Sequence, residues 1–322
     1  QRLQIEHTDD GKRATGVTVR IGAQGEQTLT ARREVILAAG AIGSPQILQL
    51  SGVGPGQLLQ QRGIRVVHEL AGVGENLHDH LQIRSVYRVQ NTVTMNQRAN
   101  SLLGKALMGL EYFALKTGPL TMPPSQLGAF AKSDSSRASA NIEWHVQPLS
   151  LDKFGEPLHD FNAITPSVCN LQPTSRGHVR LKAPYPDSYP AITLNYLTTE
   201  ADRQVALQGL RFTRRIMAAD ALAKYRPEEW KPGPDLTSDA QLLEAAGELG
   251  TTIFHPVGSC KMGSDSMAVV SDRLEVHGVS GLRVIDASVM PQITSGNTNA
   301  PTVMIAEKGA AFIVEDALAR MS

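Results

Sequence analysis

The sequence predicts a mixed α/β (α+β) protein in which two α/β segments flank a stretch of antiparallel sheet, and three observations support this fold class. An apolar run that ends in glycine, residues 34–40, is typical of a buried parallel strand. From about residue 77 to residue 250, short strands are punctuated by proline, as in antiparallel sheets. The α/β pattern then returns near the end of the chain. The expected segments are 1–76, 77–250 and 251–322.

The first 31 residues are expected to form a β-meander. Apolar and polar residues alternate along them, which is typical of half-buried strands. Turn signals at Asp9–Gly11 and Gly22–Gly25 separate the alternating stretches. The expected strands are Gln1–His7, Ala14–Ile21 and Gln27–Ala31.

The meander leads into a predicted strand–helix unit. Glu34–Gly40 is a continuous apolar run ending in glycine, which predicts a fully buried parallel strand whose carboxyl end meets a ligand. Ser44 followed by Pro45 indicates an N-cap and a first-turn proline. A helix is therefore expected over Pro45–Leu50, ending at Ser51.

The middle segment combines strands with helices. The predicted strands are Ile142–Val146, Ile164–Leu171, His178–Lys182 and Ala191–Tyr196. Predicted helices cover Leu102–Leu115, the stretch from Thr199 to about Ala219, and a stretch that begins at Ser238 and ends near Gly250. Ser238 and Gln241 have the spacing of a capping box. In the last segment, Leu282–Asp286 predicts another buried strand, and Pro301 near the first helical position predicts a helix to about Ala319.

The composition favours small-molecule chemistry. The 322 residues include 31 Lys+Arg and 31 Asp+Glu, and no block of like charges suggests binding to nucleic acid or to an anionic membrane surface. No apolar run approaches the roughly 18 residues of a transmembrane helix. The two cysteines, Cys169 and Cys260, are too few for a disulfide framework or a metal site, which suggests a reducing, cytoplasmic location.

Three stretches are unusually dense in residues that a generic core does not require: Gly40–Gly54, His255–Gly263 and Gly281–Ala310. The first resembles the second signature of the glucose-methanol-choline (GMC) oxidoreductase family. The others resemble its catalytic-histidine loop and its C-terminal flavin-contacting strand and helix. This resemblance implies part of an FAD-binding Rossmann-like domain, an antiparallel-sheet substrate domain, and the oxidation of a primary alcohol to an aldehyde, as in choline dehydrogenase-like enzymes.

The resemblance implies that His255 is the catalytic base and that Asn297 is its partner across the flavin, with Asn299 as the competing candidate. A neutral imidazole, with an ordinary pKa near ~6.5, suits proton abstraction from a hydroxyl at neutral pH. From the residues alone, one histidine among nine is more often structural, and either asparagine could cap a helix.

Other residues are expected to contact FAD, according to the same resemblance. Asp286 resembles an acidic residue that helps to hold the ribityl-phosphate portion, and Ala287 would offer its backbone N–H. The helix near Pro301 would direct its positive end towards the flavin. The glycines could also serve only strand–helix packing, and Asp286 could be a turn residue. The full expected set is Gly40, Ser44, Pro45, Asp286, Ala287, Asn299, Ala300 and Pro301.

The expected substrate-lining residues are Phe254, Trp144, His145 and Gln126. Choline-oxidising relatives carry a glutamate where Gln126 stands, so an uncharged primary alcohol is favoured over choline. Glu143, Trp144, His145 and Gln147 alternate on a predicted strand, and the sequence leaves open which pair lines the site.

The chain lacks the G-x-G-x-x-G turn with which the family opens. By family length, on the order of 200 residues are expected before Gln1, including the adenine-binding glycines. With an incomplete FAD site, this chain alone is expected to be colourless and inactive. Its expected partners are that N-terminal segment, an alcohol, and O2 or a quinone as electron acceptor. The alternatives are a hydroxynitrile lyase of the same fold and a catalytically inactive fragment.

Overall fold

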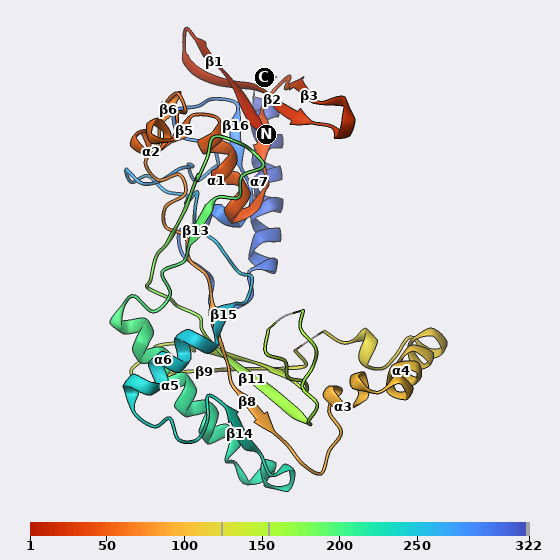
Figure 1. Cartoon of the computed structure of the whole chain (residues 1–322). Helices are drawn as coiled ribbons and strands as arrows, with labels where there is room; N and C mark the ends of the chain where they lie inside the picture. Colours follow the sequence, from red (N-terminus) through yellow and green to blue (C-terminus); the bar gives the residue numbers. More distant parts are fainter. Residues whose placement is uncertain (124, 154, 320–322) are drawn as a thin grey trace. The chain divides into compact units, whose positions relative to one another are not determined.

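The computed structural model describes residues 1–123, 125–153 and 155–319, and it contains two compact units (Figure 1). Unit 1 comprises Gln1–Asp79, Ser175–Tyr196 and Phe254–Ser322. Unit 2 comprises His80–Thr174 and Leu197–Ile253. The expected boundaries near residues 76 and 250 lie close to two of these crossings, whereas 175–196, expected in the middle segment, cluster with unit 1.

Unit 1 opens with the predicted β-meander, which is confirmed. Strands β1 (Arg2–Thr8), β2 (Gly11–Arg20) and β3 (Glu26–Thr30) form an antiparallel sheet in that order. A short 3₁₀ turn, η1 (Gly22–Gln24), connects β2 to β3. A Cβ at Gly16 would lie 2.3 Å from the Leu29 carbonyl oxygen, so the close approach of β2 to β3 requires glycine there.

The predicted parallel strand is present as β4 (Val35–Leu37), which pairs in parallel with β16 (Leu282–Val284). Its burial is less complete than expected, because Ile36 is 45% exposed. Helix α1 (Gly40–Leu50) begins five residues earlier than predicted, so the prediction that Ser44 caps it was wrong, and Pro45 lies inside it.

A proline inside α1 is tolerated because a side chain satisfies the carbonyl that it leaves without its helical partner. Pro45 has no N–H to donate to Ala41 four residues earlier. The Ser259 hydroxyl donates to the Ala41 carbonyl oxygen instead, at 2.5 Å. The C-terminal part of unit 1 thereby holds the start of α1.

The rest of unit 1 consists of short elements around one core and a long terminal helix. Strand β5 (Val53–Gly54) pairs in parallel with β6 (His68–Glu69), and β12 (His178–Arg180) pairs antiparallel with β13 (Ala191–Thr193). The other elements are α2 (Gly56–Gln61), the 3₁₀ turn η4 (Ala287–Val289) and α7 (Asn299–Ala319). Pro301 is the third residue of α7, not the first.

Unit 2 is built on a seven-stranded sheet whose pairings are all antiparallel, as predicted. The order is β14-β8-β11-β10-β9, and β7 pairs with both β11 and β15. The strands are β7 (Leu81–Arg84), β8 (Val86–Arg88), β9 (Leu127–Ala131), β10 (Ile142–Gln147), β11 (Ala163–Asn170), β14 (Glu228–Lys231) and β15 (Gly250–Thr252).

Two helices, α5 (Glu200–Met217) and α6 (Asp239–Leu249), pack on one face of this sheet. Their apolar residues form a core with Trp144 and Val168 from the strands. The predicted capping box at the start of α6 is confirmed. The remaining helical elements are α3 (Met95–Asn100), α4 (Leu102–Leu115), η2 (Pro119–Thr121) and η3 (Asp220–Tyr225).

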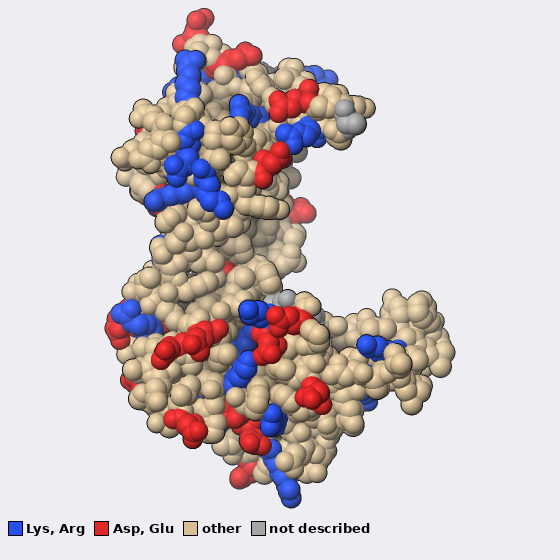
Figure 2. Space-filling model, in the orientation of Figure 1, with Lys and Arg blue, Asp and Glu red and all other residues tan. Residues whose placement is uncertain are grey.

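Charged side chains of both signs are interspersed over the face of unit 2 in Figure 2, in keeping with the formal net charge of zero. Across the described ranges, no helix is both long enough and apolar enough to span a membrane.

Candidate active site

His255 begins a loop that a buried carboxylate holds in place. The backbone N–H of His255 donates to Asp79 Oδ1 at 2.9 Å, and the Tyr196 hydroxyl donates to Asp79 Oδ2 at 2.6 Å. Asp79 is only 2% exposed. Phe254, immediately before His255, has a φ of 64°, a left-handed conformation that costs a non-glycine residue about 1–2 kcal/mol. The bond to Asp79 helps to maintain this conformation, which sets the direction of the His255 side chain.

The next residues of the loop are held by His78. Val257 and His78 exchange backbone hydrogen bonds of 2.9 and 3.1 Å. The His78 ring lies with Nδ1 2.7 Å from the Asn76 carbonyl oxygen, so Nδ1 donates and Nε2 accepts the N–H of Ile293 at 2.8 Å. The string His78-Asp79-His80 is dense in titratable groups, and this density is the sequence signal that could have indicated its place beside the site.

The structure brings His255 next to Asn297. Asn297 Nδ2 lies 3.5 Å from His255 Nε2, and both side chains are accessible to solvent. An amide N–H directed at Nε2 requires a lone pair there, which is the form of imidazole that can accept a proton. A hydroxyl group placed between them could donate to Nε2 and accept from the amide. No such contact to the His255 ring is found for Asn299, the competing candidate, which is the first residue of α7.

Five of the expected cofactor residues follow the carboxyl ends of β4 and β16, where parallel strands usually meet ligands, and the other three begin α7. Three of them, Asp286, Ser44 and Pro45, are buried and contact other parts of the protein. Asp286 Oδ2 accepts from Gly40 N at 2.9 Å and from Ser44 Oγ at 2.6 Å, and Oδ1 accepts from Ser288 N at 2.8 Å. Ser44 and Pro45 are buried. These bonds fix the turn between β4 and α1.

The other expected cofactor residues are at least partly accessible. Gly40 has a φ of 75°, and a Cβ there would meet no atom within 4 Å. Asn299 and Ala300 are exposed, Ala287 is half-buried, and Pro301 lies just inside the first turn of α7. A flat ring could approach Gly40 closely, and the positive end of this 21-residue helix would favour negative charge. The residues present therefore fit part of a flavin site.

Two of the expected substrate-lining residues, Trp144 and His145, lie on opposite faces of the unit 2 sheet. The Trp144 indole N–H donates to Thr213 Oγ1 at 2.8 Å, and its ring packs against Phe212 with ring centres 5.0 Å apart. His145, next to it on β10, points to the opposite face. Trp144 thus belongs to the helix-facing core, and it cannot line a site that His145 lines.

This packing assigns the alternating residues of β10 to two faces of the sheet. Glu143, His145 and Gln147 share the face opposite the helices, where His145 Nε2 lies 3.3 Å from Glu143 Oε1. Gln126 is exposed just before β9, and its backbone N–H donates to the Val146 carbonyl. Phe254, in unit 1, is 68% exposed.

Comparison with known proteins identifies the family. Two models described as GMC oxidoreductase match residues 1–82 and 173–306. The chain belongs to the GMC oxidoreductase family. It is 44% identical over 300 residues to an oxygen-dependent choline dehydrogenase of Ectopseudomonas mendocina, covering 93% of this chain and 53% of that protein. The corresponding Escherichia coli enzyme is 43% identical, with coverage of 97% and 56%. The chain thus spans about half the length of the curated relatives it matches.

Solved structures agree with this assignment. A formate oxidase matches with a TM-score of 0.90 and 26% identity, covering 98% of this chain and 59% of that chain. Pyridoxine 4-oxidase from Mesorbium loti matches with a TM-score of 0.81 and 29% identity, covering 96% and 56%. FAD modification is described for formate oxidase from Aspergillus oryzae. Family membership and these neighbours support FAD as the cofactor that the sequence resemblance implied.

Proposed function

We propose that this chain is part of an FAD-dependent enzyme that oxidises a primary alcohol to the aldehyde, with His255 as the catalytic base. The observation that carries the proposal is the pair of His255 Nε2 and Asn297 Nδ2, 3.5 Å apart, in a GMC oxidoreductase. A base and a hydrogen-bond donor at this separation are what an alcohol needs as its hydroxyl loses a proton.

Each residue of the pair has a separate task. His255 Nε2 takes the hydroxyl proton, and the Asn297 amide donates to the oxygen as it gains negative charge. Asp79 and His78 hold the loop from which the imidazole projects. When bound, FAD supplies the acceptor for the hydride that leaves the alcohol carbon, because no side chain can accept hydride.

Backbone around the ends of β4 and β16 would hold the part of FAD that this chain contacts. Gly40 permits a close approach, Ala287 and Ala300 have small side chains, and the start of α7 favours negative charge on the reduced ring. Asp286, Ser44 and Pro45 would support this surface from the interior, without touching the cofactor themselves.

The substrate that we propose is a primary alcohol without a quaternary ammonium group. The similar choline dehydrogenases are named for a cationic alcohol. In this chain Gln126, a neutral residue, stands where the sequence resemblance places a glutamate in choline-oxidising relatives. A carboxylate near the cation would stabilise it far more than an amide does. As the similar dehydrogenases are named oxygen-dependent, O2 is the proposed electron acceptor.

The proposed activity is tested by mixing the protein, in its complete natural form, with alcohols in the absence of O2 and following the flavin absorbance. Loss of the oxidised-flavin band with formation of aldehyde is expected. Choline and 3,3-dimethyl-1-butanol, its neutral isostere, form a matched substrate pair. The isostere should have the higher kcat/KM, and Gln126→Glu should reverse the preference.

Two other outcomes correspond to the alternative functions. A hydroxynitrile lyase would cleave a cyanohydrin while its flavin stays oxidised through every turnover. An inactive protein would show neither bleaching nor cleavage. Either result would overturn the proposed oxidation.

A further inference from the structure

Asn76 joins the two stretches of unit 1 that carry His255 and Asn297. Its Nδ2 donates to the Gly258 carbonyl oxygen at 3.1 Å and to the Pro291 carbonyl oxygen at 3.3 Å. Gly258 lies three residues after His255, and Pro291 lies six residues before Asn297. One amide group therefore bonds to the main chain of both stretches.

The backbone conformation of Asn76 suits an asparagine. Its φ is 59°, in the left-handed region, where asparagine is several-fold enriched among the non-glycine residues. A turn alone requires this conformation, but it does not require the two bonds that the Asn76 amide donates. The conformation and the bonds can therefore be tested separately.

A guanidinium fixes the orientation of the Asn76 amide. Arg176 Nε donates to Asn76 Oδ1 at 3.1 Å. Because a guanidinium can only donate, the amide oxygen must face Arg176 and the amide nitrogen must face the two carbonyl oxygens. Next to this contact, Leu77 and Gly177 exchange backbone hydrogen bonds of 3.0 and 2.7 Å. These bonds keep Arg176 beside the amide.

The packing around Gly258 leaves little room for movement. Gly258 has a φ of 91°, and a Cβ there would lie 2.6 Å from both the Asn76 carbonyl oxygen and His78 Cε1. The His78 ring also bonds to the second stretch, because its Nε2 accepts from Ile293 N at 2.8 Å. Movement of one stretch relative to the other would therefore break bonds to Asn76 or His78.

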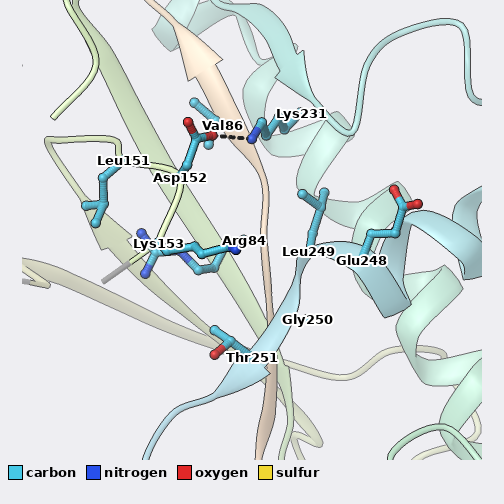
Figure 3. A pocket seen from close by; sticks show the side chains of 10 residues that line it. All are labelled: Arg84, Val86, Leu151, Asp152, Lys153, Lys231, Glu248, Leu249, Gly250 and Thr251. Atoms are coloured by element: carbon cyan, nitrogen blue, oxygen red, sulfur yellow. Dashed lines mark hydrogen bonds and ion pairs between the residues drawn. The ribbon is translucent and has the colours of Figure 1, made fainter. Parts of the chain in front are cut away.

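Bonds to main-chain carbonyls restrict the backbone more than a contact between two surface side chains does. The ion pair of Lys231 with Asp152, beside a cavity in unit 2, is a contact of the second kind (Figure 3). Both of its side chains are partly exposed, and such pairs contribute little to stability. Asparagine has a shorter side chain with less rotamer freedom than lysine, so its bonds can fix the backbone on either side.

We propose that Asn76 is a positioning residue that sets the separation of His255 Nε2 and Asn297 Nδ2, and that Arg176 orients its amide. Neither Asn76 nor Arg176 is assigned a contact with the reacting atoms. This role rests on the proposed function, in which the base and the Asn297 amide hold one hydroxyl group between them. Their separation matters because a misplacement of about 1 Å can slow a reaction by about 10²-fold.

Asn76→Gly tests the amide apart from the backbone conformation, because glycine adopts the left-handed region without strain. In the complete enzyme, this variant should slow flavin reduction by alcohol about tenfold, with flavin content and substrate KM little changed. Asn76→Asp is the second variant. It keeps the shape of the side chain but has no N–H to donate, so it should slow the reduction by a similar factor.

Asn91→Gly is the matched control. Asn91 in unit 2 is also left-handed, with a φ of 57°, and its amide donates to the Lys224 carbonyl oxygen at 2.8 Å. The control variant should reduce its flavin at the rate of the unaltered enzyme. Unchanged rates in both Asn76 variants, or an equal loss in Asn91→Gly, overturn the proposal.

A double-mutant cycle separates positioning from a purely structural role. If Asn76 acts by setting the separation of His255 and Asn297, its loss should matter little once the Asn297 amide is absent. In an Asn297→Ala background, Asn76→Gly should therefore slow flavin reduction by less than about twofold. A tenfold loss in both backgrounds would show that Asn76 acts elsewhere.

Crystal structures of the unaltered protein and of Asn76→Gly test the positioning without any turnover. The separation of His255 Nε2 and Asn297 Nδ2, 3.5 Å here, should widen by at least about 0.5 Å in the variant. An unchanged separation overturns the proposal even if the rate falls. Flavin bleaching by alcohol in the unaltered enzyme tests the oxidation itself. If no alcohol bleaches the flavin, the proposed function fails, and the two structures still decide the role of Asn76.

Discussion

The two units use a histidine and a carboxylate in opposite ways. In unit 1, Asp79 binds the backbone of His255, and the ring is directed towards Asn297. In unit 2, Glu143 lies against the ring of His145, with Oε1 3.3 Å from Nε2. The first arrangement fixes a loop and presents the imidazole, whereas the second places a carboxylate beside an imidazole on a sheet face. We therefore expect His255, whose ring lies beside the Asn297 amide, to be the base.

The largest expected effect contrasts these two histidines directly. In the complete enzyme, His255→Ala should keep FAD bound and slow its reduction by alcohol by about 10²- to 10⁴-fold, the range for losing a positioned general base. His145→Ala should slow it by less than about tenfold, as expected for a substrate contact. Anaerobic stopped-flow absorbance measures both rates.

The same variants decide whether His255 has only a structural role. A structural histidine would leave the rate per bound flavin near normal and lower the thermal stability. The rate of the unaltered enzyme should also fall as pH drops and the imidazole is protonated, because a protonated ring cannot accept the hydroxyl proton. This pH dependence should disappear in His255→Ala.

The next effect concerns the partner of the base. Asn297→Ala should slow flavin reduction by about 10- to 100-fold, as expected for a hydrogen bond to a developing charge. Asn299→Ala is the matched control, since it removes the same amide two residues further along. A larger loss of rate in Asn299→Ala at equal flavin content would reverse the assignment.

A third prediction concerns the helix-facing side of unit 2. Thr213→Val removes the acceptor of the buried Trp144 indole N–H, which should cost about 1–3 kcal/mol of unfolding free energy. Because Trp144 lies in the core, flavin reduction should be unchanged. Urea denaturation measures the first effect and stopped-flow absorbance the second. If Thr213→Val keeps its stability but reduces flavin slowly, the prediction is contradicted, and Trp144 would line the substrate site.

Local patterns predicted most of the elements because each depends on neighbouring residues. The meander and the capping box at Ser238 follow from alternation and from a side chain three residues away. The start of α1 did not follow, since Pro45 inside the helix is tolerated only through Ser259, more than 200 residues later. The family motifs indicated His255 and Asn297, and the structure places these two side chains together.

Long-range contacts account for the site features that the sequence did not reveal. Asp79 meets Tyr196 and His255, which are more than 100 residues away. The assignment of Trp144 to the core required knowing which face of β10 the helices cover. Strand alternation separates two faces, but it cannot identify the one that carries the site.

Asp79 gives the fourth prediction, a smaller effect that acts through His255. Asp79→Asn keeps the size of the side chain and removes the negative charge that strengthens both hydrogen bonds, and the Tyr196 hydroxyl would have to accept from the new amide instead of donating. Flavin reduction should slow by about three- to tenfold, with substrate KM little changed. Tyr196→Phe, which leaves the bond to His255, should have the smaller effect. Equal rates in Asp79→Asn and the unaltered enzyme would contradict a positioning role.

The smallest expected effect concerns a third histidine, His68, whose ring contacts a backbone carbonyl and a lysine. His68 in unit 1 has Nε2 2.9 Å from the His277 carbonyl oxygen and Nδ1 3.2 Å from Lys12 Nζ. Burial, followed by the positive charge of Lys12, lowers the pKa of His68 from its ordinary 6.5. The neutral ring therefore donates to the carbonyl and accepts from Lys12, and protonation of Nδ1 would oppose two positive charges.

Because the pKa of His68 is lower in the folded state, the free energy of unfolding falls as the pH falls, within a defined pH range. Above pH 6.5, His68 is neutral in both the folded and the unfolded chain. Below pH 6.5, the unfolded chain binds the proton more readily, so this part of the stability is lost until the pH reaches the folded-state pKa. In His68→Gln, the difference between the melting temperatures at pH 7.5 and pH 5.5 should be slightly smaller than in the unaltered protein. Lys12→Met should also reduce the loss, because it raises the folded-state pKa of His68, and an unchanged pH dependence in both variants would show that His68 contributes nothing.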